Sequence, residues 1–526
     1  MNNWKTKLAL SVLTGILISL CFEPFGFSVI AFVAYVPLLF VLESERSFWR
    51  MLLYAWAAMF IQSLISFEWI HFVAHEFGGL SWSVCGLILF AFAIATSFSI
   101  QMFAVFYYLA KKYFKKERGY LFYLLLIPML FCLAEALDPK IFKWFLGDAL
   151  TSYKYMVQFA DVLGVSGLSF LIFIFNVSVF LIIKRKYFVP AALCVVIPLF
   201  LFVYGKQTYS NLKDVQEKCP LIRAGVVQAN IGNPIQLSIA QAMKFKSELG
   251  YGNSPYVNDM TLILKKYRTM TYSLIEANKD VDLIVWPETA FPSYYIDKSE
   301  FALEHKKMVA ALDLPFLIGG YYLDSKDHYY NSAIMILPNG QVSYYHKNML
   351  LPFGEYMPLG NYFPFLKNLV PAVSDFSRGN GPEVLKLVVQ GLEVRFAPTI
   401  CYEMLNSGYV GKMVAKDAHV LLNMSNDSWF GTVEPYQHLR ISRMRAVEYR
   451  RPIIRSTNTG ITALVDITGD VIKKSTHNKE ENIIMDVPIC DHRMRSFYSI
   501  VGKYFIYLTV LASAFIIMWS RKKRSK

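Results

Sequence analysis

Residues 392–403 read Leu-Glu-Val-Arg-Phe-Ala-Pro-Thr-Ile-Cys-Tyr-Glu, an apolar, strand-like run that brings Cys401 to the end of a strand. A polar turn and a helix are predicted to follow at residues 406–408. A helix N-terminus and free backbone N–H groups at such a junction favour a thiolate and can bind an oxyanion. A lone cysteine in apolar surroundings is more often an inert core residue. This stretch alone therefore makes Cys401 a candidate nucleophile and no more.

The composition indicates a membrane protein with a further domain attached. The chain has 526 residues, of which 55% are hydrophobic, and its mean hydropathy is +0.35. Both values exceed what a soluble core needs. The formal charge of +14 lies in short clusters beside apolar runs and in the basic tail 521–526. Such clusters are typical of membrane topology, so we expect no nucleic-acid partner.

Seven cysteines are divided between apolar runs and a polar region. Cys219, Cys401 and Cys490 are the three outside the apolar runs. No Cys-x-x-Cys spacing suggests a metal site, and no disulfide framework is visible. The nine histidines, His346 and His438 among them, show no ligand-like spacing. We therefore expect neither a metal nor another cofactor.

The N-terminal part, residues 1–205, contains about seven apolar runs of the roughly 20 residues that a spanning helix needs. An eighth run follows the polar region near the C-terminus. The first run resembles a signal peptide, but Glu23-Pro-Phe-Gly follows it where a cleavage site would need small residues, so we expect it to be retained. The predicted spans are 6–23, 27–43, 51–70, 80–109, 120–137, 163–183, 187–205 and 498–520.

Basic residues alternate between the loops that join these runs. They follow the second, fourth and sixth runs, at 46–50, 111–118 and 184–186. The positive-inside rule then places both termini in the cytoplasm and the domain after residue 206 outside. Loop 138–162 is an exception, because it is assigned outside although it contains three lysines. Its apolar and aromatic residues suggest a segment at the membrane interface instead.

Residues 215–495 are predicted to form an α/β domain, because apolar runs of strand length alternate there with helix-like stretches. The predicted strands are 222–229, 282–286, 315–320, 332–337, 341–346, 393–400, 419–424, 453–457 and 461–466. The predicted helices are 257–278, 298–312 and 434–449.

Glu288 and Lys347 each follow a predicted strand, as Cys401 does. Taken singly, Glu288 is equally well explained as an acid at a helix start and Lys347 as a solvated lysine. Together, at strand ends where open sheets build their sites, they supply complete acyl-transfer chemistry. A carboxylate accepts the thiol proton, the thiolate attacks a carbonyl, and an ammonium group stabilises the developing oxyanion.

Several motifs in this region resemble the nitrilase superfamily. They are Trp286-Pro-Glu288, Lys347, Phe353-Gly-Glu355, Cys401-Tyr-Glu403, Asn423-Met-Ser-Asn-Asp-Ser-Trp-Phe-Gly431, Gln437-His438, Arg443-Met-Arg-Ala446 and Arg455-Ser-Thr-Asn-Thr-Gly460. With eight spans around the domain, the chain looks like a member of the apolipoprotein N-acyltransferase family, the membrane-embedded branch, nearly from end to end.

The resemblance implies a fold and a reaction. The fold is an αββα sandwich at the periplasmic face of a bacterial inner membrane, carried by eight transmembrane helices. Glu288 would be the general base, Lys347 the oxyanion stabiliser and Cys401 the nucleophile, with Glu355, Tyr402 and Glu403 in support. The donor would be a phospholipid, typically phosphatidylethanolamine, whose sn-1 chain passes to the cysteine as a thioester. The acceptor would be the α-amine of S-diacylglyceryl-cysteine on an apolipoprotein.

One feature departs from the family's pattern. Members commonly carry a tryptophan soon after the first strand of the domain, but this chain has none between Trp144 and Trp286. The segment 230–258 is also long and polar. Handling of the acceptor near that strand is thus less well defined than the triad.

The loop 356–373 after Glu355 is rich in apolar and aromatic residues and is broken by three prolines. It is either packed on its own domain or forms a lid that guides acyl chains at the membrane interface. The second interpretation assigns substrate contact to Tyr356, Tyr362, Phe363 and Phe365.

Two other functions compete with acyl transfer. A membrane-tethered amidase of the nitrilase type would use the same triad but would need only one anchor. A transporter or scaffold with an inactive domain predicts polar groups facing one another in mid-membrane, and the runs contain few. Nothing in the sequence demands an oligomer, so we expect a monomer.

Overall fold

The computed structural model describes residues 3–76, 79–95, 98–114, 118–186, 188–232, 257–295, 299–352, 354–360, 362–363, 365 and 375–524. The chain divides into two compact units. A helical unit comprises Met1–His71, Trp82–Leu212 and Arg495–Lys526, and an α/β unit comprises Phe72–Ser81 and Lys213–Met494.

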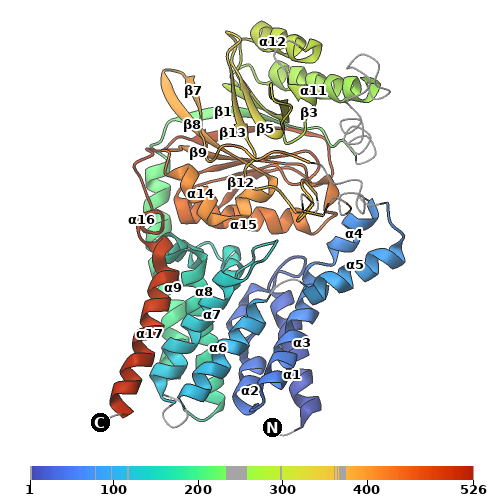
Figure 1. The fold of residues 1–526 in the computed structure, drawn as a ribbon. Coiled ribbons are helices and arrows are strands. Elements are labelled where there is room, and N and C mark those ends of the chain that lie inside the picture. The colour runs from blue at the N-terminus through green and yellow to red at the C-terminus, as the bar shows by residue number, and fades with distance from the viewer. Residues whose placement is uncertain are drawn as a thin grey trace. The chain divides into compact units, whose positions relative to one another are not determined.

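Apolar helices form the helical unit (Figure 1). They are α1 (Trp4–Leu20), η1 (Ser28–Phe32), α2 (Val36–Ser44), α3 (Phe48–Ser66), α4 (Trp69–Glu76, which continues into the other unit), α5 (Trp82–Ala95), α6 (Ser99–Tyr113), η2 (Leu121–Leu126), α7 (Ile127–Leu137), η3 (Leu146–Ser152), η4 (Met156–Phe159), α8 (Ala160–Ile183), α9 (Phe188–Gln216), α16 (Phe497–Ile500), η8 (Gly502–Tyr504) and α17 (Phe505–Arg524).

Five helices in the described residues are long and apolar enough to cross a membrane. They are Phe48–Ser66, Trp82–Tyr113, Met156–Ile183, Phe188–Gln216 and Gly502–Trp519. The chain therefore has the helices of a membrane protein, but the expected number of eight is not reached by this measure. Helix α1 has 17 residues, and the run 27–43 is divided into η1 and the nine-residue α2. Hydropathy counts apolar residues and does not detect such breaks.

Polar contacts between the helices include an amide in α8 and a cluster of ion pairs at the end of α2. The Asn176 amide in α8 accepts a hydrogen bond from Tyr35 N at 2.9 Å and donates one to Ala31 O at 2.8 Å, so it satisfies backbone groups left free between η1 and α2. At the end of α2, the Glu43 carboxylate lies 2.7 Å from the Arg118 guanidinium and 3.6 Å from the Lys184 ammonium. Two of the predicted basic loops thus meet at one end of the helices.

The α/β unit contains two sheets. Its elements are β1 (Leu221–Gln228), α11 (Val257–Ala277), β2 (Leu283–Val285), β3 (Phe291–Tyr295), α12 (Glu300–Leu312), β4 (Phe316–Leu323), β5 (Tyr329–Ile336), β6 (Val342–His346), β7 (Leu385–Val389), β8 (Leu392–Ile400), η6 (Cys401–Leu405), α14 (Ser407–Val414), β9 (Val420–Ser425), η7 (Asp427–Trp429), α15 (Glu434–Tyr449), β10 (Ile453–Thr457), β11 (Ala463–Val465), β12 (Val471–Lys474) and β13 (Glu481–Pro488).

The first sheet has the order β13-β1-β2-β4-β5-β6, with β3 paired to β4, and the second has the order β12-β11-β10-β9-β8-β7. Figure 1 shows α11 and α12 on the outer side of the first sheet and α14 and α15 on the outer side of the second. Because each sheet buries one face against helices and the other against its partner sheet, the unit has four layers. The predicted αββα sandwich is confirmed for this unit.

All nine predicted strands and all three predicted helices are present; β10 and α15 have the predicted ends, and the others are shifted by a few residues. The sequence missed β3, β7, β12 and β13. Three of these lie at the border of a sheet or carry charged residues: β12 is mostly exposed, and β7 alternates between buried and exposed positions. Strands with one face in solvent contain only short runs of apolar residues, so their sequences are hard to distinguish from loops.

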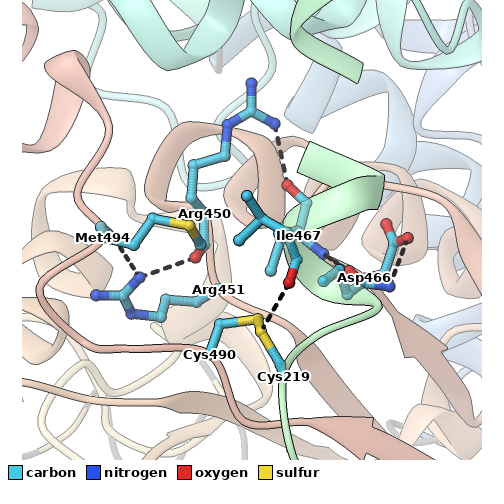
Figure 2. Close-up of a disulfide and its surroundings, with 9 residues drawn as sticks. Cys219, Arg450, Arg451, Asp466, Ile467, Cys490 and Met494 are labelled. Atoms are coloured by element: carbon cyan, nitrogen blue, oxygen red, sulfur yellow. Dashed lines mark hydrogen bonds between the residues drawn. A yellow bond between two sulfur atoms is a disulfide. The ribbon is translucent and has the colours of Figure 1, made fainter. Parts of the chain in front are cut away.

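A disulfide joins Cys219, just before β1, to Cys490, just after β13 (Figure 2). The expectation of no disulfide framework was therefore wrong. Strands β1 and β13 are antiparallel neighbours, with Leu221 opposite Pro488, and this pairing brings together two cysteines that are 271 residues apart. Sequence spacing cannot reveal a contact made by strand pairing across a whole domain.

A buried arginine holds the chain that follows this disulfide. The Arg451 guanidinium donates hydrogen bonds to Met494 O at 2.6 Å and Arg450 O at 2.9 Å (Figure 2). It also donates one to Ala418 O at 2.6 Å. Its side chain is 1% exposed. Charge-assisted bonds to carbonyl groups are stronger than neutral ones, so the last residues of the unit are fixed to its core.

Candidate active site

The three predicted catalytic residues follow three different strands. Glu288 lies three residues after β2, Lys347 directly follows β6, and Cys401 directly follows β8. The first two come from one sheet and Cys401 comes from the other. All three are buried, with 6%, 1% and 7% of their surfaces exposed. The expected placement at strand ends is confirmed.

Cys401 occupies a strained turn between β8 and η6. Its φ angle is +49°, in the left-handed region that costs a residue with a side chain about 1–3 kcal/mol. The continuous strand before it and the 3₁₀ turn after it hold this conformation. This turn places the cysteine beyond the end of the strand.

An amide and an ammonium group join two carboxylates. Asn331 Nδ2, on β5, donates to Glu288 Oε1 at 2.7 Å and to Glu355 Oε1 at 3.0 Å. Lys347 Nζ lies 2.7 Å from Glu355 Oε1 and 3.5 Å from Glu288 Oε1. The second oxygen of Glu288 accepts a bond from Asn426 N at 2.8 Å, from the end of β9. Both oxygens of Glu288 are thus held in place.

Burial and neighbouring charges shift the pKa values of all three groups. Burial raises the pKa of the Cys401 thiol well above its usual value, and the negative charge of Glu288 raises it further. Burial also raises the pKa of Glu288. Burial alone would lower the pKa of Lys347, but the carboxylates of Glu355 and Glu288 outweigh burial and raise it. At neutral pH the site therefore contains a thiol, a carboxylate with a raised pKa that makes it a stronger base than an ordinary glutamate, and a fixed ammonium ion.

Glu403 links the cysteine turn to the lysine strand. Its Oε2 accepts bonds from Ile400 N at 2.9 Å and from the Tyr345 hydroxyl at 2.7 Å. Its Oε1 accepts bonds from Asn348 N at 2.7 Å and Met349 N at 3.0 Å. The side chain is fully buried. With four donors around it, this carboxylate fixes the position of Cys401 relative to Lys347. These bonds support the role predicted for Glu403, which is to hold the site in place.

The motif from 423 to 431 forms a buried polar network behind Glu288. Asp427 Oδ2 accepts a bond from Arg455 Nη2 at 2.5 Å, and Asp427 Oδ1 accepts one from the Ser425 hydroxyl at 2.5 Å. Arg455 also donates to the Asn423 side chain. A Cβ on Gly460 would lie 1.9 Å from Asp427 Oδ2, so only glycine fits there. The network holds the β9 end from which Asn426 reaches Glu288.

The other predicted residues are placed as follows. Tyr402 is half-buried, and its pKa is raised by burial and by the nearby Tyr356. Tyr356 is itself half-buried beneath the Arg378 guanidinium, 5.5 Å from its ring centre. Tyr362, Phe363 and Phe365 are 81%, 50% and 61% exposed. Residues 361, 364 and 366–374 of the loop, and Phe353, lie outside the described residues.

A second cluster of ionisable groups lies near the first. Glu434 and His438, four residues apart on α15, and Asp427 have ligand atoms within 4.8 Å of one another, and all three are buried. Our expectation of no ligand-like spacing among the histidines missed His438. The acidic partner lies one helical turn earlier, a spacing that a search for pairs of histidines or cysteines does not detect.

Sequence reasoning also missed Asn331 and Glu434. A weak signal existed for Asn331, because it is a polar residue at the start of the apolar stretch 332–337. Glu434 precedes Pro435 at the start of the predicted helix 434–449, and nothing in that local pattern marks it as a site residue. Its relation to the cysteine depends on α15 packing against η6, which no local pattern predicts.

Comparison with known proteins agrees with this geometry. The carbon-nitrogen hydrolase family matches residues 223–493, and the apolipoprotein N-acyltransferase N-terminal domain matches residues 14–178. The apolipoprotein N-acyltransferase of Bdellovibrio bacteriovorus is 35% identical over 498 residues, covering 89% of this chain and 86% of that protein. The protein of the same name from Chlorobaculum tepidum is 29% identical over 516 residues, covering 91% and 90%. The chain therefore belongs to the apolipoprotein N-acyltransferase family, within the nitrilase superfamily.

Proposed function

We propose that this chain transfers a fatty acyl group from a membrane phospholipid to the N-terminal α-amine of an S-diacylglyceryl-cysteine on an apolipoprotein, through a thioester on Cys401. The donor is a phospholipid such as phosphatidylethanolamine, which gives its sn-1 chain. The observation that carries the proposal is the buried pair of Glu288 and Lys347 at strand ends, with the half-buried Glu355 bonded to Lys347 and the Cys401 thiol within reach of their charges. These groups supply a base, an oxyanion stabiliser and a nucleophile.

In the first half of the reaction, Glu288 takes the proton of the Cys401 thiol as sulfur attacks the ester carbonyl. The Lys347 ammonium stabilises the negative oxygen of the tetrahedral intermediate. The carbon–oxygen bond then breaks, and the leaving alkoxide of the lysophospholipid receives the proton from Glu288. Because the carboxylate returns to its starting state, the enzyme is left changed only by the thioester.

In the second half, the acceptor amine attacks the thioester carbonyl. A carbon–nitrogen bond forms, the carbon–sulfur bond breaks, and Cys401 regains its thiol. A ping-pong route suits two lipid substrates, because they need to occupy the same apolar site only in turn. One chain supplies every residue of the site, which supports action as a monomer.

We propose the following arrangement in the membrane: a bundle over 1–205 with seven spans, a catalytic domain over 215–495, an eighth span over 498–520 and a cytoplasmic tail over 521–526. The protein resides in the bacterial inner membrane with both termini in the cytoplasm and the catalytic domain in the periplasm. The Cys219–Cys490 disulfide supports this orientation, because disulfides persist in oxidising compartments. The contacts of Arg118 and Lys184 with Glu43 support a common, cytoplasmic side for their loops.

The loop after Glu355 is proposed to meet the membrane interface and guide the acyl chain. The exposure of Tyr362, Phe363 and Phe365 supports this role, since exposed aromatic clusters are typical of surfaces that contact lipid. Tyr356, beside Tyr402, joins this loop to the cysteine turn.

The test is the mass of the purified protein after exposure to phosphatidylethanolamine vesicles. We expect one added acyl group on the peptide that contains Cys401, released when a peptide with an N-terminal S-diacylglyceryl-cysteine is added. Cys401→Ser should abolish the addition, because an alcohol ionises far less readily than a thiol. Release by water as fast as by the peptide would instead indicate an amidase-like hydrolase. No added mass on the folded wild-type protein would refute the proposal.

A further inference from the structure

The mechanism above gives no role to the buried carboxylate of Glu434. Glu434, in the first turn of α15, is 1% exposed. Its Oε1 lies 2.6 Å from His438 Nδ1. Apart from this contact, neither oxygen of Glu434 has a hydrogen-bond partner among the described residues, and the same holds for both ring nitrogens of His438. Buried polar atoms without partners are energetically costly, so such a pair is unusual unless something binds it.

Glu434 lies close enough to the nucleophile to act on it. Helix α15 packs against η6, the turn that begins with Cys401. The negative charge of Glu434 contributes to the raised pKa of the Cys401 thiol. A group bound at Glu434 is therefore within electrostatic reach of the sulfur that carries the acyl chain.

The surroundings favour a hydrogen-bonding cation of one charge over a divalent metal. Asp427, the third member of the cluster, is already paired with Arg455 at 2.5 Å, so its charge is neutralised and its oxygens are occupied. The same guanidinium lowers the pKa of Glu434, although burial, the largest effect, raises it. A second strong positive charge next to Arg455 would be repelled. A primary ammonium group carries one charge and three donors, which matches one free carboxylate.

Resting on the proposed function, we propose that Glu434 binds the α-ammonium group of the acceptor and removes one proton from it, with His438 positioning the carboxylate. The ammonium gives this proton to Glu434 and becomes a neutral amine, whose lone pair forms the carbon–nitrogen bond. The electron pair of the carbon–sulfur bond passes to sulfur. The second proton leaves the nitrogen through Glu288 and restores the Cys401 thiol. Glu434 later loses its proton to solvent.

The burial that raises the pKa of Glu434 fits this task. An α-amino group has a pKa near 7.7–8.0, and a base accepts a proton more readily when its own pKa approaches that of the donor. The site would also favour the amine over water as the attacking group, because water carries no positive charge for the carboxylate to bind.

The experiment separates the two half reactions in the full-length protein. Wild type, Glu434→Gln and a matched control, Glu393→Gln at an exposed site, are first acylated with phosphatidylethanolamine vesicles. The isolated acyl-enzymes are then mixed with a diacylglyceryl-cysteinyl peptide or with hydroxylamine. Hydroxylamine is a neutral nucleophile at pH 7 and needs no base. Decay of the acyl-enzyme is followed by mass.

We expect Glu434→Gln to acylate at close to the wild-type rate but to transfer to the peptide about 100-fold more slowly, the size of a general-base effect. Its reaction with hydroxylamine should be unchanged, and Glu393→Gln should match wild type throughout. Equal losses with peptide and hydroxylamine, or normal transfer to the peptide, would overturn the assignment. So would a bound divalent metal in the purified wild-type protein. If Glu434→Gln does not fold, Glu434→Asp keeps a carboxylate and should slow transfer more than acylation; an equal slowing of both steps would count against the proposal.

Failure of the proposed function has a different signature. In that case the wild-type protein itself would form no acyl-enzyme. Failure of the inference about Glu434 would leave the wild-type acyl-enzyme intact and alter only the comparison between variants.

Discussion

Glu403, two residues after Cys401, accepts a hydrogen bond at 2.7 Å from the backbone N–H of Asn348, the residue after Lys347. The bond joins a segment of the first sheet to the cysteine turn of the second. The relative position of nucleophile and ammonium is thus set by a group that is itself fully buried. Glu403 is therefore a positioning residue, which affects the reaction by holding the segments that carry Cys401 and Lys347.

Glu403→Gln should therefore impair both folding and acylation. An amide has one acceptor oxygen, so its NH₂ group would face donors that now bond to a carboxylate, and the unfolding free energy should fall by about 1–3 kcal/mol. Thermal melting and the acylation rate check this. Tyr345→Phe removes only one of the four donors and should cost less in both measurements. Acylation by Glu403→Gln at the wild-type rate would mean that the positioning role is wrong.

The acylation rate should fall in acid as Glu288 becomes protonated. Burial raises the pKa of this carboxylate, so the loss begins at a higher pH than for an ordinary glutamate. The Asn331 amide opposes the rise, because it donates a hydrogen bond to the charged form. Asn331→Ala should move the acid limb of the single-turnover acylation profile to higher pH. An unchanged midpoint in this variant would show that the acid limb reflects the titration of a group other than Glu288.

The catalytic domain should lose stability in acid because of His305. This residue packs among Trp286, Phe291 and Phe316, and both ring nitrogens lack partners among the described residues. Burial, aided by the charge of Arg268, lowers its pKa to about 3. Between that value and the unfolded value of about 6.5, the unfolded chain binds more protons, so the unfolding free energy falls by up to about 1.4 kcal/mol per pH unit as the pH drops.

His305→Phe removes this titration and should flatten the dependence of melting temperature on pH below 6.5. The exposed His328, exchanged for glutamine, provides the control and should leave the slope unchanged. Other partly buried histidines keep the variant's slope above zero. A slope as steep as that of the wild type would exclude His305 as the cause.

The orientation of the domain can be tested by labelling. Lys474, exposed on β12, becomes a reporter as Lys474→Cys, and Arg50→Cys is the matched reporter for the side predicted to be cytoplasmic. A membrane-impermeant thiol reagent should reach the first in cells with a permeabilised outer membrane and the second only after lysis of the inner membrane. The reverse pattern would invert the proposed topology. Labelling of both reporters in intact cells would show a leaky membrane and call for the control to be repeated with sealed vesicles.

The loop 356–373 should affect the use of lipid more than stability. Phe363→Asp combined with Phe365→Asp should slow acylation by phospholipid vesicles, since charged residues are expelled from the membrane interface. The melting temperature should hardly change, because both side chains are at least half exposed. Val388→Asp, at a site with 68% exposure on β7, is the matched control. A lower melting temperature with normal acylation of the folded protein would show that the loop is ordinary packing.

The sequence predicted those parts of the site that follow an uninterrupted apolar strand. Glu288, Lys347 and Cys401 were found because a strand end is visible in a local pattern of hydrophobic residues. Asn331 was not found, since its function depends on pairing between β4, β5 and β6 and on two carboxylates that approach it from other segments. The same reason applies to Glu434, which depends on how α15 packs.

The helices were predicted less completely. An apolar run such as 120–137 is continuous in hydropathy, but its first part, η2, is a π-helix. The left-handed turn at Gly164 likewise interrupts α8, where a side chain would collide with Tyr498. Breaks of this kind come from contacts between segments distant in the chain, so hydropathy alone reports neither their place nor their effect on span length.

The nucleophile lies, in the sequence, between the two cysteines of the disulfide. Cys219 and Cys490 are bonded, and Cys401 between them is a free thiol. If the domain is exported from its N-terminal end, Cys401 emerges before Cys490, at a time when Cys219 has no native partner. The first pair of thiols available to an oxidase is then the one that would disable the enzyme. With the proposed orientation, maturation would require that Cys401 be sequestered early, or that a wrong bond be exchanged by a disulfide isomerase.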